Sequence, residues 1–526
     1  MARPSAAGSD PFADPSRLSA DHEYAEASTL PVGRNASLTL ATDSLITRIS
    51  LEEGPAIAAV FCLQVDIPIK SEEARGVPNG LVGAKTTQAI PFFNVLWAEL
   101  SDFDITIKYA KPASTNVVRV ATINYLVEKA QQGYAKSWTS KLLDRAYGES
   151  QRQKRIKVLI NPFGGQGSAQ KWYLRDIEPI FAAARCEVEV ERTLYQGHAV
   201  EIAEKLDTNA YDVIASCSGD GLPHEVFNGL GKKADAISAL SKVAVVQLPC
   251  GTGNAMSWNL NGIDSTSMAA LCTVKGIRTP LDLASVTQGD KRTLSFLSQS
   301  LGIVADVDLG TEHIRWMGSA RFTYGFLIRF LKKAKYPCDL AVKIDIPTKG
   351  AIKDHYRREL TNRALIEDRR DKSIASNQAQ GLPPLKYGTV SSALPQDFTP
   401  IPSTKLGNFY AGNMALMAPR ANFFPATLPS DGHLDLVTVD GDISRIDAIK
   451  SFLAVENGGF FDKPHVNYKK ISAYRITPHQ SKGYISIDGE SMPFEPFQAE
   501  VHRGLGTVLS RSGHLYEADG VVPRIG

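Results

Sequence analysis

Residues 211–221, YDVIASCSGDG, contain the feature around which the rest of the chain can be arranged. A short apolar run, typical of a buried strand, ends in a carboxylate between two glycines, and the helical stretch LPHEVFNGL (222–230) follows at once. Glycine lets the backbone approach a phosphate closely, and the start of a helix favours a negatively charged ligand. We therefore predict that Asp220 lies in a crevice at a strand end, where it takes part in chemistry.

Two further glycine-rich loops follow apolar strands, in residues 155–167 (RIKVLINPFGGQG) and 243–254 (VAVVQLPCGTGN). Strand and helix patterns alternate regularly from 155 to 260, which predicts a parallel sheet with helices on both faces. Open sheets of this kind bind ligands at the carboxyl ends of their strands. The three loops together indicate a nucleotide site.

The blocks NPFGGQGSA (161–169), SGDGLPHEVFNGL (218–230) and LPCGTGNA (248–255) resemble, in this order and spacing, the catalytic domain of the diacylglycerol kinase superfamily. Residues 301–325, LGIVADVDLGTEHIRWMGSARFTYG, are similar to its sphingosine kinase branch. The resemblance covers residues 150–335 and 405–510. It implies a lipid kinase that uses ATP and Mg²⁺ to phosphorylate the primary hydroxyl of sphingosine and related sphingoid long-chain bases.

The resemblance also implies roles for individual residues, with Asp220 as the general base. The nucleotide side is implied to contain Asn161, Pro162, Phe163, Thr193, Leu194, Tyr195, Gln196, Gly197, Glu225, Gly251, Thr252, Gly253, Arg315, Arg321, Asp488, Gly489 and Glu490. The substrate side is implied to contain Ser218, Gly219, Gly221, Ser298 and Asp308, with Asp308 paired to the amine of the sphingoid base. No metal ligands are assigned.

Each of these residues also has a plainer interpretation. Asp220 could cap the helix that begins near Leu222, because Asp is common at that position. The alternation in IVADVD (303–308) predicts a strand with Asp306 and Asp308 on one face, where Asp306 is solvated or capped. Asp488-Gly489 is typical of a tight hairpin turn, and single arginines are commonly solvated.

Several other functions compete with the sphingosine kinase interpretation. Diacylglycerol kinase, ceramide kinase and an enzyme similar to NAD kinase or phosphofructokinase are alternatives, and so is a non-catalytic lipid-sensing scaffold. Ser218, the sequence PHE at 223–225 and the ADVDLG stretch argue against the NAD kinase alternative, and an intact Asp220 argues against the scaffold. The chain lacks the GxxxxGK[ST] loop of P-loop enzymes and the HRD and DFG motifs of protein kinases.

The composition of the chain excludes some classes of binding partner and indicates where the protein is located. A formal net charge of +2 excludes a typical nucleic-acid binder, which carries a strong basic excess. The six cysteines are scattered and favour reduced core thiols over disulfides or a zinc site. The chain shows neither a secretory signal nor an apolar run long enough for a membrane span, so we expect a cytoplasmic protein that contacts membranes peripherally. The sequence does not indicate an oligomeric state.

The expected fold is α/β followed by β, with an additional N-terminal domain. A disordered tail (1–35) precedes a mainly-β domain with a closing helix (36–150), which is similar to a pleckstrin-homology-like module or only packs on the rest. A catalytic α/β domain (151–280) follows. Strand patterns of period two predict an antiparallel domain (281–347 and 404–515), where the resemblance implies a lipid-binding β-sandwich. The charged, Pro- and Ser-rich residues 348–403 predict a flexible insertion.

Overall fold

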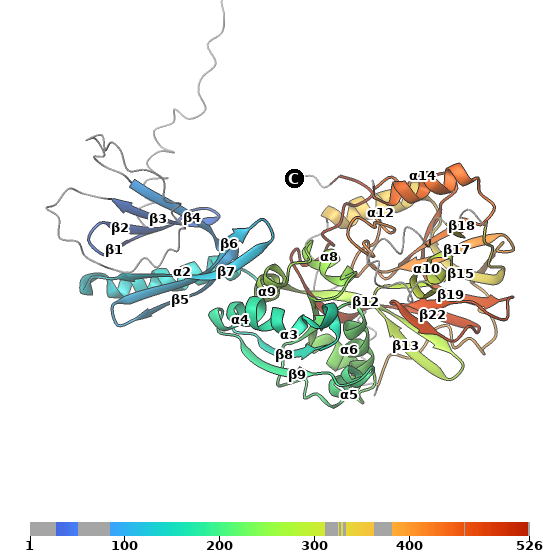
Figure 1. Cartoon of the computed structure of the whole chain (residues 1–526), viewed down its shortest axis with the longest axis horizontal. Coiled ribbons are helices and arrows are strands. Elements are labelled where there is room, and N and C mark those ends of the chain that lie inside the picture. Colours follow the sequence, from blue (N-terminus) through green and yellow to red (C-terminus); the bar gives the residue numbers. More distant parts are fainter. Residues whose placement is uncertain are drawn as a thin grey trace, which may run out of the picture. The chain divides into compact units, whose positions relative to one another are not determined.

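The computed structural model describes residues 28–50, 85–310, 325, 328–329, 333–361, 381–456 and 458–523 of the chain (Figure 1). The described residues up to 111 and from 120 to 148 form one compact unit, called unit 1 here. Those from 112 to 119 and from 149 onward form a second, larger one, unit 2.

Unit 1 consists of two antiparallel sheets and one long helix. Its elements are β1 (Thr29–Val32), β2 (Ala36–Leu40), β3 (Ser44–Ser50), β4 (Lys85–Pro91), β5 (Val95–Ser101), β6 (Asp104–Ser114), β7 (Val117–Leu126) and α2 (Gln132–Tyr147). Strands β1–β4 form one sheet and β5–β7 the other. α2 joins both, since the Trp138 indole N–H donates to the Ser28 carbonyl at 2.9 Å and the Tyr147 hydroxyl donates to the Leu96 carbonyl at 2.6 Å.

The predicted disordered tail is wrong for its last residues. Residues 29–32 pair with β2 as an edge strand, and Leu30 and Val32 are buried because they alternate onto the core face. Residues 1–27 of the predicted tail lie outside the described residues. The expected mainly-β region with its closing helix is present, and its likeness to a pleckstrin-homology module stays a prediction.

The first half of unit 2 is a parallel sheet with alternating helices, as predicted. Its strands are β8 (Arg155–Ile160), β9 (Glu187–Arg192), β10 (Val213–Ser218) and β11 (Ala244–Pro249), in the spatial order β9-β8-β10-β11. The helices are α3 (Ala169–Trp172), the π-helical turn η4 (Tyr173–Ile177), α4 (Glu178–Ala183), α5 (His198–Lys205), α6 (Gly221–Gly231), α7 (Ala236–Lys242), α8 (Ala255–Asn261) and α9 (Thr266–Lys275). β10 and β11 are buried along their whole length, which explains their continuous apolar sequences.

The second half is antiparallel. Its strands are β12 (Ile277–Gln288), β13 (Lys291–Ser295), β14 (Ser298–Gly302), β15 (Cys338–Ile346), β16 (Thr399–Ile401), β17 (Leu406–Gly412), β18 (Leu434–Asp440), β19 (Asn467–Pro478), β20 (Ile485–Ile487), β21 (Glu490–Met492) and β22 (Phe497–Ser510). Its helices are α10 (Ile303–Gly310), α12 (Lys349–Thr361) and α14 (Arg445–Glu456). Side chains of β12, β15, β19 and β22 meet those of β14, β17 and β20 in one apolar core.

The predicted parallel-sheet domain and antiparallel domain are not separate, because the strands of both halves are hydrogen-bonded into a single 15-stranded sheet. β22 makes the connection: near its end Val508 lies beside Val245 of β11, and along its length it pairs with β12 and β19. A register shift between Leu281 and Leu283 bends β12 where it passes from one half to the other.

The predicted flexible insertion is also wrong for the residues that the structure describes. Residues 349–361 form α12, whose Ile352 and Tyr356 are buried in apolar clusters. Residues 399–401 form β16, and both oxygens of the buried Glu500 carboxylate accept backbone N–H groups from residues 386 and 387 at 2.9 Å. Residues 362–380 lie outside the description. The low apolar content of the segment concealed the few side chains that anchor it.

The five described cysteines are free thiols, four of them buried. None of the described helices is both long enough and apolar enough to cross a membrane.

Candidate active site

The three glycine-rich loops meet at one edge of the parallel sheet. Cys217 is in register with Ile160, and Ser218 with Pro249, so β8, β10 and β11 end at the same level. A Cβ atom on Gly251 would lie 2.4 Å from the Cα of Gly219, so the close approach of two loops requires glycine at 251. Gly253 has more room, since a Cβ there would be 3.4 Å from its nearest neighbour, an oxygen of Asp220.

The carboxylate of Asp220 lies between these loops. It accepts the backbone N–H groups of Ala255 and Met256, both at 3.0 Å, and the side-chain N–H of Gln247 at 3.2 Å. Asp220 stands at the N-cap position of its own helix α6 but makes no side-chain capping bond there. The alternative, that Asp220 caps its own helix α6, is therefore wrong, because its side chain binds the first turn of α8 instead.

The environment of Asp220 is suited to a base. Burial raises its pKa above the ordinary value, its three hydrogen bonds oppose this, and the charge of Asp488 raises it further. The residue as a whole remains partly exposed where the glycine loops meet. A carboxylate with a raised pKa that stays accessible is a better proton acceptor than an ordinary surface aspartate.

Two residues that the sequence did not single out hold this arrangement. Gln247, a polar residue inside the apolar strand β11, donates to Asp220 and accepts the N–H of Ser257 at 2.9 Å. Asn254 adopts a left-handed conformation (φ 50°), and its side chain both accepts from and donates to the backbone of Gly251 at 2.9 Å. The sequence feature that could have identified Gln247 is a polar side chain within an otherwise apolar strand.

The predicted nucleotide residues of β8 and β9 form the adjoining loops. Asn161 accepts the N–H of Phe163 at 2.9 Å, which turns the chain across Pro162. Thr193 is buried and its N–H donates to the carbonyl of Ile160. The side chains at the loop tips are exposed and large, namely Phe163 (78%), Leu194 (69%) and Tyr195 (53%).

Glu225 supports this loop instead of facing outward. Its two carboxylate oxygens accept the N–H groups of Gly197 at 3.0 Å and Ala199 at 3.1 Å. N–H groups at the start of a helix such as α5 have no acceptor within the helix itself. Beside it, Gln196 donates to Glu490 at 3.3 Å, and the other oxygen of Glu490 lies where a Cβ on Gly221 would come within 3.1 Å. Glu490 thus stands against the Asp220 loop.

Asp488 was predicted to bind the nucleotide, but both its oxygens are occupied within the protein. They accept from the Ser295 hydroxyl, from three backbone N–H groups of residues 296–298 and from the His224 ring, at 2.7–3.0 Å. Asp488 and Gly489 both have positive φ (54° and 86°) in the two-residue turn between β20 and β21, as the hairpin alternative predicted. The carboxylate is thus a structural anchor for the turn before β14.

His224 is a further residue that the sequence did not identify. It lies one helical turn after Asp220 on α6, and its ring contacts Asp488 at 2.9 Å and Asn228 at 3.3 Å. Burial lowers the pKa of His224, but the hydrogen bond and charge of Asp488 outweigh it, so the pKa lies above the ordinary value. The pair therefore joins α6 to the antiparallel half of the unit.

The predicted strand at 303–308 is in fact helix α10. Its buried residues are Ile303, Ala305 and Val307; the alternation suits a strand, but Ile303 and Val307 are four apart, a spacing that also fits one face of a helix. Asp306 and Asp308, two apart, consequently face different neighbours instead of one surface. Asp306 accepts from the Tyr336 hydroxyl at 2.6 Å and from Arg329 at 3.3 Å, so it is a structural residue paired within the protein and not simply solvated or capped, as its plainer interpretation had it.

Asp308 faces the turn that Asp488 anchors. Its carboxylate accepts the Ser486 hydroxyl at 3.1 Å and would lie 4.0 Å from a Cβ on Gly489. Burial and the charges of Asp308 and Asp488 raise the pKa of Tyr410, whose hydroxyl is hydrogen-bonded to Ser298. The predicted substrate residues Ser298 and Asp308 therefore share one region with Asp488. Arg315 and Arg321 lie outside the described residues.

Comparison with known proteins gives two family matches. Residues 155–286 match the family model described as the diacylglycerol kinase catalytic domain. Residues 28–148 match a domain of unknown function (DUF7493).

Three similar proteins can be named. The chain is 36% identical over 429 residues to sphingoid long chain base kinase 5 of Saccharomyces cerevisiae, over 72% of this chain and 62% of that protein. It is 35% identical over 426 residues to sphingoid long chain base kinase 4 of Schizosaccharomyces pombe, over 80% of this chain and 88% of that protein. The crystal structure of a putative diacylglycerol kinase from Bacillus anthracis superimposes with a TM-score of 0.48 and 17% identity, over 69% of this chain and 97% of that one.

Proposed function

The chain belongs to the sphingoid long-chain base kinase family, and on that premise we propose that it transfers the terminal phosphoryl group of ATP to the primary hydroxyl of a sphingoid long-chain base. The relatives confirm the family that the glycine-rich blocks indicated. The observation that carries the proposal is Asp220, an accessible carboxylate with a raised pKa at the meeting point of two glycine loops. There it can accept the hydroxyl proton as the new phosphate ester bond forms.

The loops fit a nucleotide in their chemistry. Backbone N–H groups at the strand ends suit phosphate oxygens, and the exposed side chains of Phe163, Leu194 and Tyr195 provide an apolar surface for a purine base. Glu490, which stands against the Asp220 loop, is the oxygen donor that would hold Mg²⁺. The ion, when bound, neutralises charge on the phosphate groups. Glu225 positions the loop and does not need to touch the nucleotide.

The acceptor side supports a substrate that is cationic at one end and apolar along its length. Asp308 supplies a fixed anion beside Ser486 and Tyr410. The same helix, α10, contributes Ile303 and Val304 to a narrow apolar pocket of about 40 Å³, completed by aromatic side chains that include Phe423 and Phe460. A protonated amine matches this fixed anion, because an unpaired buried charge is costly.

We further propose, as the sequence predicts, a cytoplasmic protein of which a fraction binds membranes reversibly. In α14, Ile446, Ile449 and Leu453 are exposed at spacings that place them on one face of the helix. Residues 451, 452 and 455 of the same helix line the apolar pocket. The two faces support the entry of substrate from a bilayer into the pocket beside α14.

Transfer of labelled phosphate from ATP tests the proposed activity. Sphingosine, dihydrosphingosine and phytosphingosine should be phosphorylated in preference to diacylglycerol, ceramide and NAD. Preference for one of the last three would contradict the proposal. Ile449→Glu combined with Leu453→Glu should reduce binding to anionic vesicles while leaving turnover of detergent-dispersed sphingosine unchanged. Unaltered vesicle binding would remove α14 from the membrane contact.

A further inference from the structure

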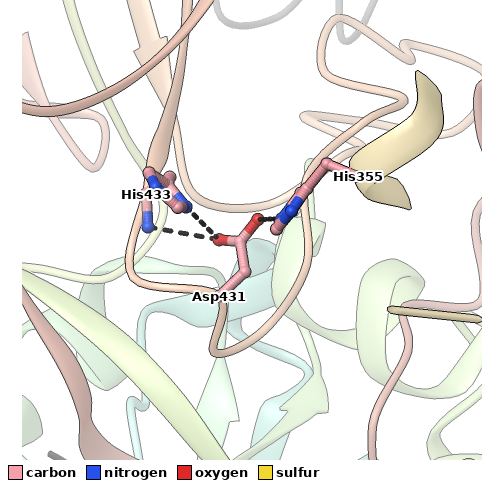
Figure 2. Close-up of side chains that lie close together, drawn as sticks. All are labelled: His355, Asp431 and His433. Atoms are coloured by element: carbon pink, nitrogen blue, oxygen red, sulfur yellow. Dashed lines mark hydrogen bonds and ion pairs between the residues drawn. The ribbon is translucent and has the colours of Figure 1, made fainter. Parts of the chain in front are cut away.

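A second cluster of chemically active side chains lies where α12 meets the loop before β18. His355 of α12 and Asp431 and His433 of the loop point toward one another (Figure 2). His355 Nε2 is 3.0 Å from one oxygen of Asp431, and His433 Nδ1 is 3.6 Å from the other. Asp431 is buried, and both imidazole side chains are mostly buried, at 13% and 19% exposed.

These separations are those of metal ligands. One ligand atom from each of the three residues can be chosen so that all lie within 4.8 Å of one another. Bonds of about 2.0–2.2 Å to a tetrahedral ion hold neighbouring ligand atoms about 3.4 Å apart. The two imidazole nitrogens lie 3.0 and 3.6 Å from different oxygens of Asp431, on either side of that value, so the carboxylate would hold the ion through both oxygens.

A simple ion pair explains His433 less well. A charge-assisted hydrogen bond to a carboxylate is about 2.7–2.9 Å long, so 3.6 Å is too far for one. The Asp431 oxygen on that side already accepts the backbone N–H of His433 at 3.1 Å. Nδ1 is buried and has no hydrogen-bond partner among the residues that the structure describes. A buried imidazole nitrogen that lacks a hydrogen-bond partner among the described residues and lies beside a carboxylate suits an ion between them.

The charges around the cluster also favour a cation. Two buried carboxyl groups, those of Asp431 and Asp435, contact one buried ammonium, Lys470, and a third, that of Asp282, lies near Asp431. Lys470 Nζ lies 2.8 Å from both Asp431 and Asp435. The guanidinium of Arg503, which also faces Asp282, is exposed. Because negative groups outnumber buried positive ones, an additional cation would lower the cost of burying them.

The surroundings hold the loop in place. Both oxygens of Asp282 accept backbone N–H groups at 2.6 Å, from Gly432 inside the loop and from Gly504 of β22. Lys470 occupies one oxygen of Asp431 and leaves the other facing His433. Outer partners of this kind fix the orientation of metal ligands.

We propose that His355, Asp431 and His433 form a binding site for a divalent transition-metal ion of the zinc class, which ties α12 to the loop that precedes β18. Two imidazoles and one carboxylate suit Zn²⁺ and its first-row neighbours, whereas Mg²⁺ and Ca²⁺ prefer oxygen ligands alone. Water completes the coordination. The site is made from residues outside the candidate active site, so its role is structural.

The test uses the full-length chain, purified without a histidine tag and stripped of metal by dialysis. Calorimetric titration with Zn²⁺ should show one equivalent bound per chain, and Zn²⁺ should raise the thermal unfolding temperature. His355→Gln and His433→Gln each remove one ligand but keep the Asp431–Lys470 pair, and should weaken binding by at least about 10- to 100-fold. His479→Gln is the control, since His479 pairs with Asp339 at 2.8 Å in an exposed position.

Either glutamine variant suffices if the other fails to fold, which circular dichroism will show. Visible absorption of bound Co²⁺ gives a second readout, because its bands depend on imidazole ligation. Wild-type protein that binds none of Zn²⁺, Mn²⁺ and Co²⁺ stoichiometrically would overturn the proposal. Glutamine variants that bind Zn²⁺ as tightly as the His479→Gln control would overturn it equally, and the histidines would then be hydrogen-bonding partners of Asp431 alone.

Discussion

The two sides of the candidate active site are built differently. On the nucleotide side, each loop follows its own strand directly, and the contacts of Asp220 come from residues no more than 36 positions away. On the acceptor side, Asp488 binds residues 190–193 positions away in the turn before β14, and His224 at 264 positions. Asp220 is thus held by segments close to it in the sequence, whereas Asp488 is held by segments far from it.

The comparison indicates that these two carboxylates have different roles. Asp220 is partly exposed and accepts three hydrogen bonds, so it can still take a proton. Asp488 is buried and accepts five, so its capacity is used in holding the turn, β14 and α6 together. Substitutions whose effects on turnover and on stability are measured separately therefore test this difference.

The largest effect is expected for Asp220→Asn. Loss of a general base should lower kcat by about 10²- to 10⁴-fold. Both oxygens accept N–H groups, so the new amide would oppose one donor and cost about 1–3 kcal/mol of stability. Steady-state kinetics and urea unfolding measure the two effects. Asp212→Asn, which disturbs the ion pair with Arg155 at the start of β10, should leave kcat unchanged. Near-normal turnover in folded Asp220→Asn protein would end the assignment.

The next effect concerns the acceptor. Asp308→Asn should lower kcat/KM for sphingosine by about 10- to 150-fold, the equivalent of a lost charge-assisted contact of about 1.5–3 kcal/mol, with the KM for ATP unchanged. Asp306→Asn is the matched control on the same helix, since that side chain binds Tyr336 and Arg329. It should lower the unfolding temperature and spare sphingosine kinetics. A raised KM for ATP in the Asp308 variant would show that Asp308 is not the partner of the amine.

Asp488→Asn should act mainly on stability. Because it removes the charge from a buried, fully hydrogen-bonded pair, the free energy of unfolding should fall by about 3–5 kcal/mol, measured by urea titration. Glu490→Gln, two residues further, should change stability little and affect the kinetics with ATP. If Asp488→Asn protein were fully stable and only its KM for ATP rose, the result would support the direct contact between Asp488 and the nucleotide that the sequence predicted.

The smallest effect is a pH dependence at His224. Its pKa is raised in the folded protein, so its favourable contribution is complete below the ordinary histidine pKa of about 6.5 and is lost as the pH rises through the folded value. The stability difference between wild type and His224→Asn should therefore shrink from mildly acidic to alkaline pH. Unfolding temperatures of both proteins across that range measure it. A difference that grows with pH would mean that His224 is neutral in its pair with Asp488.

Local patterns determined much of the fold. A buried strand, a glycine turn and a helix are specified by neighbouring residues, so the parallel order, the meeting of three loops and the position of Asp220 could be predicted. The same holds for the two-residue turn at 488–489, since both positions need positive φ. The resemblance added the family, which the relatives confirm.

Some sequence patterns fit two kinds of structure, and only the folded chain shows which of the two forms. The alternation in residues 303–308 fits a strand, but Ile303 and Val307 also fit one helical face, and packing against the second core selected the helix. The sequence likewise could not show that β22 would pair with β11, β12 and β19 and so merge two predicted domains into one sheet.

By itself, the sequence determined which strands end in glycine loops and which carboxylate stands among them, because those features depend on residues close together in the chain. Only the tertiary structure decided what the other polar groups do. Asp488 became an anchor, Gln247 a support for Asp220, and His355 a neighbour of Asp431. The reason is physical: a buried polar group must find partners wherever the fold brings them, and no spacing along the chain records which distant donors arrive.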